Sequence, residues 1–183
     1  DRYPEVMDRL GDLETLFDQL IVFPSSFVTT DPGVRAALAS SRALFCAREL
    51  DSYAQIKGLT RRAACMLDTA LMFDFTPYRK PGRLGSVLHA YRTDLEARGL
   101  PVPSINVDIS ALASSLDHWL WMIACHEMVK TDRAHVMMAG AALGKKVIYR
   151  PSDSFKVDAL AAFLPKDLDV SRERMAAMDP LVR

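Results

Sequence analysis

The stretch Thr131-Asp132-Arg133-Ala134-His135, with the residues on either side of it, decides the fold class. A short apolar segment precedes it and predicts a buried strand. Residues 136–144 are small and apolar and predict a helix, with Asp132 as its N-cap and Gly144 where a glycine commonly ends a helix. Residues 146–149 predict the next strand. The unit is strand, turn, helix, strand, and its polar residues lie at the start of the helix.

The same alternation extends over most of the chain. Besides the strand before Thr131, we expect strands at residues 20–23, 43–47, 63–67, 87–91, 105–109 and 146–149. We expect helices at residues 1–19, from Asp31-Pro32 onward, and at 50–57, 110–127, 136–144 and 157–164. Short strands joined by helices are typical of a parallel sheet. The predicted fold class is therefore α/β, with parallel sheets and flanking helices.

Residues 75–85 interrupt the alternation. They contain Pro77, Pro81, Gly82 and Gly85, a composition that is typical of a connection rather than of a strand or helix. We expect a crossing between two domains at residues 77–85, with an N-terminal domain at residues 1–76 and a C-terminal domain at residues 86–183.

The composition favours a soluble protein without a general affinity for nucleic acid. The 183 residues include 23 Lys and Arg and 23 Asp and Glu, so the formal charge is zero. The three cysteines are too few for a disulfide framework and have no metal-site spacing, which favours reduced thiols, no bound metal and a cytoplasmic location. No apolar run approaches the ~18 residues that span a bilayer, so we expect at most peripheral association with a membrane.

Polar groups follow four of the predicted strands. They are Ser25-Ser26, Arg48-Glu49, Arg92-Thr93-Asp94, and Thr131-Asp132-Arg133 with His135. In open α/β sheets, ligands bind at the carboxyl ends of the strands. Three arginines and a histidine would suit an acidic ligand, because a guanidinium pairs with a phosphate or a carboxylate through two hydrogen bonds.

Each of these groups also has a purely structural interpretation. Arg48 and Glu49 could be an exposed pair that caps a helix, and Arg92 and Asp94 a surface ion pair. Arg133 could pair with Asp132 or Glu127, and His135 could be a partly buried histidine in an apolar helix. No dinucleotide-binding glycine motif, P-loop, nucleophile elbow or zinc motif is present to decide between these alternatives.

Taken together, these elements resemble the polysaccharide pyruvyl transferase family. The family's C-terminal signature is Thr-Asp-Arg-Leu-His, an apolar helix, Leu-Gly-Lys-Pro-Val and an Asn-Ser-Tyr-Gly-Lys loop. This chain has Thr131–His135, the apolar helix, Leu143-Gly144-Lys145-Lys146-Val147 and the loop Ser154-Phe155-Lys156.

Upstream elements follow in the family's order. Residues 21–27 resemble its apolar strand with Pro-Gln-Ser, residues 47–53 its Ala-Arg-Glu-x-x-Ser-Tyr, and residues 67–70 its Pro-Asp-x-Ala. Residues 91–96 are similar to its arginine-bearing strand end. Asp1-Arg2-Tyr3-Pro4 resembles the residues that follow the family's Gly-rich loop, so we expect this chain to lack that loop.

The resemblance implies two facing Rossmann-like domains, as in GT-B glycosyltransferases, the first of them partial here. It implies transfer of pyruvate from phosphoenolpyruvate to two hydroxyls of a sugar in an exopolysaccharide or cell-surface glycan precursor, including a lipid-linked oligosaccharide, without a further cofactor. His135 would be the general acid or a phosphate-contacting group, and Arg48 would bind the donor's carboxylate or phosphate. The other residues implied in substrate binding are Arg133, Arg92, Ser26, Ser52, Asp132 and Lys156.

Two alternatives remain open from the sequence. A GT-B glycosyltransferase could hold a nucleotide sugar in the same basic site. A catalytically silent domain of the same fold could bind a glycan or a partner, and it would keep its biological activity without His135 and Arg48.

Overall fold

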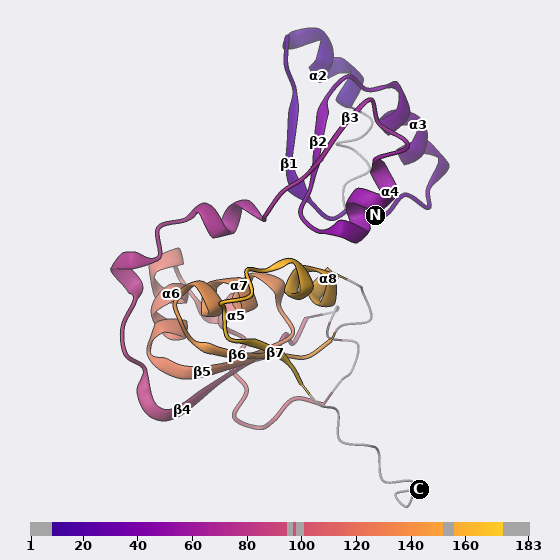
Figure 1. Ribbon diagram of the computed structural model, residues 1–183. Helices are drawn as coiled ribbons and strands as arrows, with labels where there is room; N and C mark the ends of the chain where they lie inside the picture. Colours follow the sequence, from indigo (N-terminus) through magenta and orange to yellow (C-terminus); the bar gives the residue numbers. More distant parts are fainter. Residues whose placement is uncertain (1–8, 95–96, 98–100, 152–155, 174–183) are drawn as a thin grey trace, which may run out of the picture. The chain divides into compact units, whose positions relative to one another are not determined.

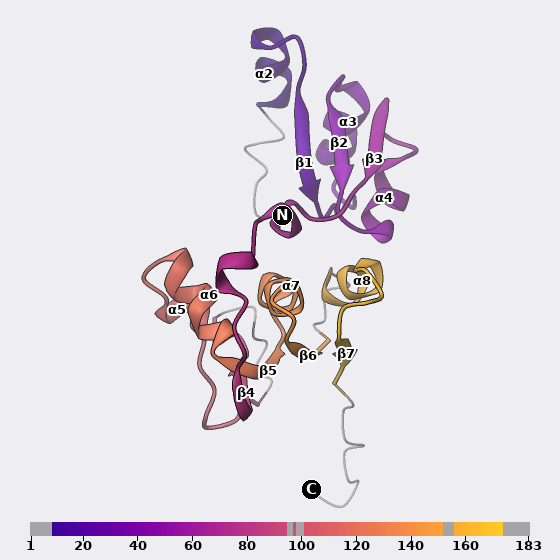
Figure 2. The same ribbon diagram turned by 60° about the vertical axis from the view of Figure 1, so that its left-hand side comes forward.

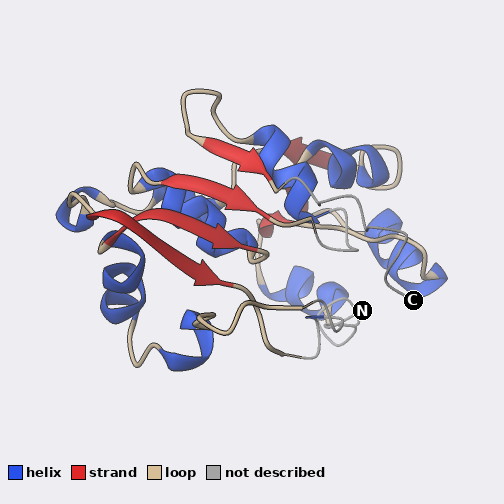
Figure 3. Cartoon of the chain, turned by 90° about the horizontal axis from the view of Figure 1, so that it is seen from below, coloured by secondary structure: helices blue, strands red, loops and turns tan. Residues whose placement is uncertain are grey.

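A computed structural model describes residues 9–94, 97, 101–151 and 156–173 of the chain. The chain divides into two compact units. Unit 1 is Asp1–Met72 with Ala162–Leu164, and unit 2 is Phe73–Ala161 with Pro165–Arg183. Helices and strands alternate along the chain in both units (Figure 3).

Unit 1 is built on a parallel sheet of three strands in the order β1-β2-β3. The strands are β1 (Ile21–Ser25), β2 (Leu44–Ala47) and β3 (Arg62–Cys65), and the helices are α2 (Leu10–Leu16), α3 (Pro32–Ser40) and α4 (Leu50–Ile56), followed by the 3₁₀ turn η1 (Thr69–Met72). Pro24 is tolerated within β1 because this strand lies at an edge of the sheet. Asp31 caps α3 by accepting a hydrogen bond from the Val34 backbone N–H, and Pro32 follows at the first helical position, as the sequence predicted.

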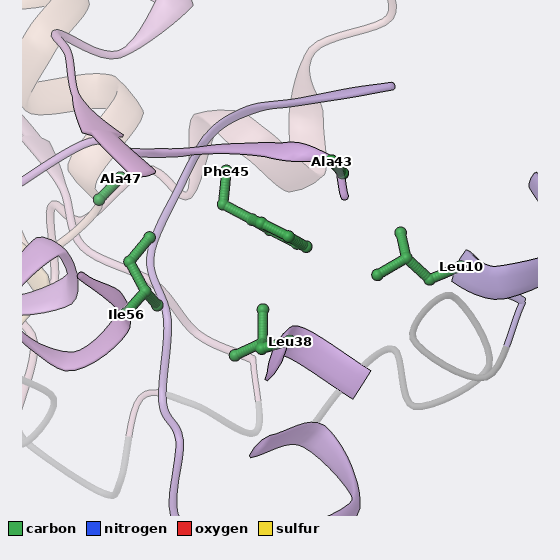
Figure 4. Packing of buried hydrophobic residues seen from close by; sticks show 6 residues of the cluster. All are labelled: Leu10, Leu38, Ala43, Phe45, Ala47 and Ile56. Carbon is green, nitrogen blue, oxygen red and sulfur yellow. The ribbon is translucent and has the colours of Figure 1, made fainter. Parts of the chain in front are cut away.

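The core of unit 1 joins its helices to the central strand. Its buried side chains come from α2, α3, α4, β2 and the residue before β2, and they are drawn in Figure 4: Leu10, Leu38, Ala43, Phe45, Ala47 and Ile56. Phe45 is fully buried and packs edge-to-face against Phe27, which follows β1. This packing fixes the carboxyl ends of β1 and β2 beside each other.

Unit 2 is built on a parallel sheet of four strands in the order β4-β5-β6-β7 (Figures 1 and 2). The strands are β4 (Arg83–Ala90), β5 (His126–Thr131), β6 (Lys146–Tyr149) and β7 (Val170–Arg172). The helices are η2 (Thr76–Tyr78), α5 (Ile109–Leu112), α6 (Leu116–Ala124), α7 (Ala134–Ala142) and, as far as Ala161, α8 (Lys156–Phe163). Consecutive parallel neighbours joined by helices form βαβ units, the repeat of Rossmann-like folds.

Helix α7 packs closely on this sheet. Six of its nine residues are buried, and Gly140 is so close to β6 that an added Cβ would lie 3.0 Å from a methyl group of Val147. Gly144 follows the helix with φ +75°, the left-handed conformation predicted for the glycine that ends it. The close packing fixes the position of the first turn of α7 relative to β5.

The predicted fold class, parallel sheets with flanking helices in two Rossmann-like halves resembling GT-B, is confirmed. Several boundaries were wrong. Residues 105–109 are not a strand: the side chain of Asn106 pairs with both backbone groups of Tyr91, and one further backbone bond joins Val107 to His89. The helix predicted at 110–127 is two helices, because Ser115 caps α6 and β5 begins at His126.

Two further expectations changed. Strand β7 was not predicted, because its sequence Val170-Ser171-Arg172 has no apolar run. The long N-terminal helix is limited to α2 within the described residues, and the part predicted at residues 1–8 lies outside them. Among the residues that the structure describes, no helix is long and apolar enough to cross a membrane.

Candidate functional site

In unit 1, Arg48 directly follows β2 and is held by two neighbouring segments. Its Nε donates to Ser26 Oγ at 2.9 Å, and its Nη1 lies 2.9 Å from Asp68 Oδ2. Ser26 follows β1 and Asp68 comes shortly after β3, so all three belong to the carboxyl side of the sheet. The pair is well shielded, since the Arg48 and Asp68 side chains are 16% and 6% exposed. Arg48 is therefore a preorganised cation on the side of the sheet at which open α/β folds commonly bind ligands.

Glu49 does not pair with Arg48, although it does cap a helix. Its carboxylate accepts from the backbone N–H of Ser52 at 2.7 Å and from the Ser52 hydroxyl, and both residues are fully buried. The Ser52 Oγ also accepts from the Phe27 backbone N–H at 2.7 Å. This chain of bonds ties the start of α4 to the loop after β1, which carries Ser26. The exposed Arg48–Glu49 pair considered from the sequence is thus wrong.

In unit 2, Asp132 is bonded to the loop after β4 and does not cap α7. Its Oδ1 accepts from the backbone N–H of Arg92 at 2.9 Å, while Arg133 occupies the N-cap position without a side-chain capping bond. Burial raises the pKa of Asp132, although the Arg92 hydrogen bond and the charges of Arg92 and Arg133 act against this rise. The predicted cap is wrong, because the Asp132 carboxylate is bonded to the loop after β4 instead.

Arg92 and Arg133 lie within one charged cluster, which we call the unit 2 arginine cluster: Arg92, Asp94, Asp108 and Arg133. Arg92 Nε lies 2.9 Å from Asp94 Oδ1, the ion pair considered from the sequence. Arg133 Nη2 lies 2.7 Å from Asp108 Oδ2 and 3.3 Å from Asp94 Oδ2. Arg133 thus pairs with these two carboxylates rather than with Asp132 or Glu127. Carboxylates partly neutralise the arginines that were predicted to attract an anion.

His135 and Lys156 lie at the first turns of two helices. His135 is in the first turn of α7 and is exposed, so the alternative of a partly buried histidine is wrong. Lys156 begins α8 and is half-buried, while Ser154 and Phe155 of the same predicted motif lie outside the described residues. A helix N-terminus favours an anion near both side chains.

Three residues at the carboxyl ends of β4, β6 and β7 form a second cluster that the sequence did not suggest. The Arg150 guanidinium stacks 4.0 Å above the Tyr91 ring, and its Nε donates to Glu173 Oε2 at 3.0 Å. The Tyr91 hydroxyl donates to Glu173 Oε1 at 3.0 Å. Burial, followed by the Glu173 hydrogen bond and charge, raises the pKa of Tyr91 to about 12. The cluster fastens the ends of β4, β6 and β7 together.

Sequence reasoning missed Asp108 and Glu173 because it searched the residues that follow predicted strands. Asp108 lay inside the strand wrongly predicted at 105–109, and Glu173 follows the unpredicted β7. Asp68 was noted only within a resembling motif. No group of three or more His, Cys, Asp or Glu residues suited to a metal ion occurs in the described part of the chain.

Comparisons with known proteins agree with the resemblance seen in the sequence. The family model described as "Polysaccharide pyruvyl transferase" matches residues 12–154. A search of curated proteins found no match. A crystal structure of a functionally uncharacterised protein from Klebsiella pneumoniae subsp. pneumoniae is similar in fold, with a TM-score of 0.72 and 19% sequence identity over 96% of this chain and 69% of that chain.

Proposed function

The chain belongs to the polysaccharide pyruvyl transferase family, and on that premise we propose that it transfers pyruvate from phosphoenolpyruvate to two hydroxyls of a sugar in an exopolysaccharide or cell-surface glycan precursor. In this reaction the methylene carbon of the donor gains a proton and two acceptor oxygens bond to the central carbon. The bond from that carbon to the phosphate oxygen breaks. The two hydroxyl protons replace the proton used and protonate the released phosphate.

The observation that carries this proposal is the placement of four basic side chains. Arg48 in unit 1, and Arg92, Arg133 and His135 in unit 2, all follow strands at their carboxyl ends. Phosphoenolpyruvate carries a phosphate and a carboxylate, and arginine binds both through paired hydrogen bonds. Protonation of its methylene carbon requires a positioned acid.

Within this proposal each residue has a distinct role. His135, which is exposed at the start of α7, is the general acid or contacts the phosphate. Arg48 binds the carboxylate or phosphate, with Arg92, Arg133 and Lys156 contributing to the same task. Ser26 holds Arg48. Ser52 and Asp132 are buried and bonded to backbone: Ser52 holds the loop that carries Ser26, and Asp132 holds the loop that carries Arg92. No cofactor is proposed, and the proposed location is the cytoplasm.

A donor assay tests the proposal. The protein is incubated with phosphoenolpyruvate and a panel of p-nitrophenyl hexosides, and released phosphate and the mass of the glycoside are measured. We expect phosphate release that needs both substrates and a glycoside product that has gained a pyruvyl ketal. Consumption of UDP-glucose without use of phosphoenolpyruvate would support the glycosyltransferase alternative instead.

Substitutions at the two principal residues separate an enzyme from a silent domain. His135→Gln and Arg48→Ala should each lower kcat/KM roughly 100-fold or more, since general acid catalysis and charged transition-state contacts each contribute about that much. The matched controls are His118→Gln, at an exposed histidine in the first turn of α6, and Arg62→Ala, at an exposed arginine that begins β3 and so lies at the amino end of the strand. Unchanged activity in the first two variants contradicts the assigned roles.

A further inference from the structure

Asp108 lies at the end of a segment that is fastened along the edge strand β4. The Asn106 side chain bonds both the N–H and the C=O of Tyr91, at 2.9 and 3.0 Å, and the Val107 N–H donates to the His89 carbonyl at 2.8 Å. Asp108 then begins α5 and is 7% exposed. These bonds fix the segment in place, so the Asp108 carboxylate is held beside the carboxyl end of β4.

The carboxylate of Asp108 is organised around one oxygen. Its Oδ2 accepts from the Thr93 N–H at 2.9 Å, from the Thr93 hydroxyl at 3.1 Å and from Arg133 Nη2 at 2.7 Å. Although burial raises the pKa of Asp108, the bonds from Arg133 and Thr93 outweigh it and leave the pKa below its usual value. Asp108 is therefore a charged acceptor at neutral pH, and its position is fixed from both sides.

Asp108 holds Arg133 more firmly than Asp94 does. The Asp108 contact is 2.7 Å long with a 6% exposed side chain, whereas the Asp94 contact is 3.3 Å long with a 46% exposed side chain. Exposed ion pairs contribute little, and Asp94 is also shared with Arg92. Both bonds engage Nη2, so one corner of the guanidinium is anchored.

We propose that Asp108 is a positioning residue that holds the guanidinium of Arg133 in place for the anionic donor; this inference rests on the proposed pyruvyl transfer. Arginine carries a large rotamer entropy, and an anchored guanidinium meets its ligand without losing that freedom. Small displacements of a positioning group can cost about 100-fold in rate. Arg133 also lies two residues before His135, so the anchor acts beside the proposed acid.

A purely electrostatic role for Asp108 predicts a change in KM, whereas a positioning role predicts a change in kcat. Steady-state kinetics can therefore separate the two roles. Removing a negative charge beside Arg133 would strengthen attraction for an anionic donor and lower KM. Loss of positioning should instead lower kcat. Asp108→Ala is therefore expected to lower kcat roughly 10- to 100-fold without a lower KM. Asp108→Asn, which keeps an oxygen to accept from Arg133 and Thr93, should restore most of that loss.

The experiment is a double-mutant cycle of Asp108→Ala and Arg133→Ala, measured by phosphate release from phosphoenolpyruvate with the accepted glycoside. If Asp108 acts through Arg133, the double variant is no slower than Arg133→Ala alone. Asp94→Ala is the matched carboxylate control and should lose much less. Melting temperatures of all variants accompany the kinetics.

The possible outcomes separate the two proposals. Additive losses in the double variant, or an unchanged kcat in Asp108→Ala, overturn the positioning role while pyruvyl transfer stands. An Asp108→Asn variant as slow as Asp108→Ala, with an equal fall in melting temperature, assigns Asp108 a structural role only. An unmutated protein that neither binds phosphoenolpyruvate by calorimetry nor releases its phosphate overturns the proposed function, and with it the positioning role.

Discussion

Tyr91 shows how a single residue can link three strand ends. Its ring is 1% exposed and lies under Arg150, and its hydroxyl bonds Glu173. Burial and the neighbouring carboxylate both disfavour the phenolate, which is why the pKa rises to about 12. A group whose folded pKa exceeds its unfolded value contributes stability that is complete below the unfolded pKa and lost as pH rises through the folded one.

This gives a prediction for alkaline pH. The loss of unfolding free energy in Tyr91→Phe should be constant below about pH 10. It should become smaller between about pH 10 and 12, because the unmutated protein loses the Tyr91 contribution there. Urea unfolding at a series of pH values measures it, and a near-ultraviolet titration should show Tyr91→Phe lacking the last component to ionise. Tyr78, which is half-buried and whose pKa the Asp117 hydrogen bond raises, is the comparison residue. A Tyr91 that ionises near pH 10 contradicts this account.

At the scale of the elements, β4 and β5 pair from their first residues, Arg83 and His126. Just before β4, the backbone at Gly82 comes very close to the backbone at the start of β5. A Cβ added at Gly82 would overlap the backbone of His126 and Glu127. Backbone atoms cannot move aside as a flexible side chain would, so β4 and β5 would have to separate. The Arg83 N–H bond to the Cys125 carbonyl, at 3.1 Å, would be weakened with them.

Gly82→Ala should therefore destabilise the protein by about 1–3 kcal/mol, the usual range for overpacking. Gly58→Ala is the matched control, because nothing lies within 4 Å of the Cβ that it would add. It should change stability by no more than about 0.5–1 kcal/mol. Chemical unfolding of both variants checks the difference, and equal effects would show that the approach at Gly82 is not restrictive.

The elements also show what the sequence could and could not reveal. Parallel strands with buried apolar runs, such as residues 44–47 and 146–149, were predicted almost to the residue because burial imposes their composition. Residues 105–109 alternate between apolar and polar residues like a strand, yet the Asn106 side chain makes the bonds to Tyr91 that a strand backbone would make. The alternation of apolar and polar residues cannot reveal such side-chain bonds. The strand-end rule found Arg48, Arg133 and the Arg92–Asp94 pair. It missed Asp68 and Asp108 as the partners of Arg48 and Arg133, because they come from segments distant in sequence.

At the scale of the whole molecule, each unit by itself repeats one arrangement. Arg48 with Asp68 in unit 1, and Arg133 with Asp108 in unit 2, place a shielded arginine–aspartate pair on the carboxyl side of a parallel sheet. With 23 basic and 23 acidic residues, the net charge exerts no strong pull on a ligand. Under the proposed function, attraction for the anionic donor would therefore have to come from the local arginines, whose charges these carboxylates only partly neutralise.

Two carboxylates of unit 2, Asp108 and Asp132, should affect stability in acid in opposite directions. The pKa of Asp108 is lowered, so its contribution is complete above its unfolded value, near 3.8, and lost as pH falls through the folded value. Burial raises the pKa of Asp132, so its ionisation opposes folding and its contribution declines as pH rises. Asp108→Asn should thus cost most near neutral pH and progressively less below about pH 4, while Asp132→Asn should cost more in acid than at neutral pH. Urea unfolding of the two variants between neutral pH and the onset of acid unfolding tests this pair of opposite trends. Parallel profiles for the two variants would contradict this account. It predicts a difference because Asp108 has three donors on one oxygen, including the Arg133 guanidinium, whereas Asp132 is buried and bonded to backbone N–H groups.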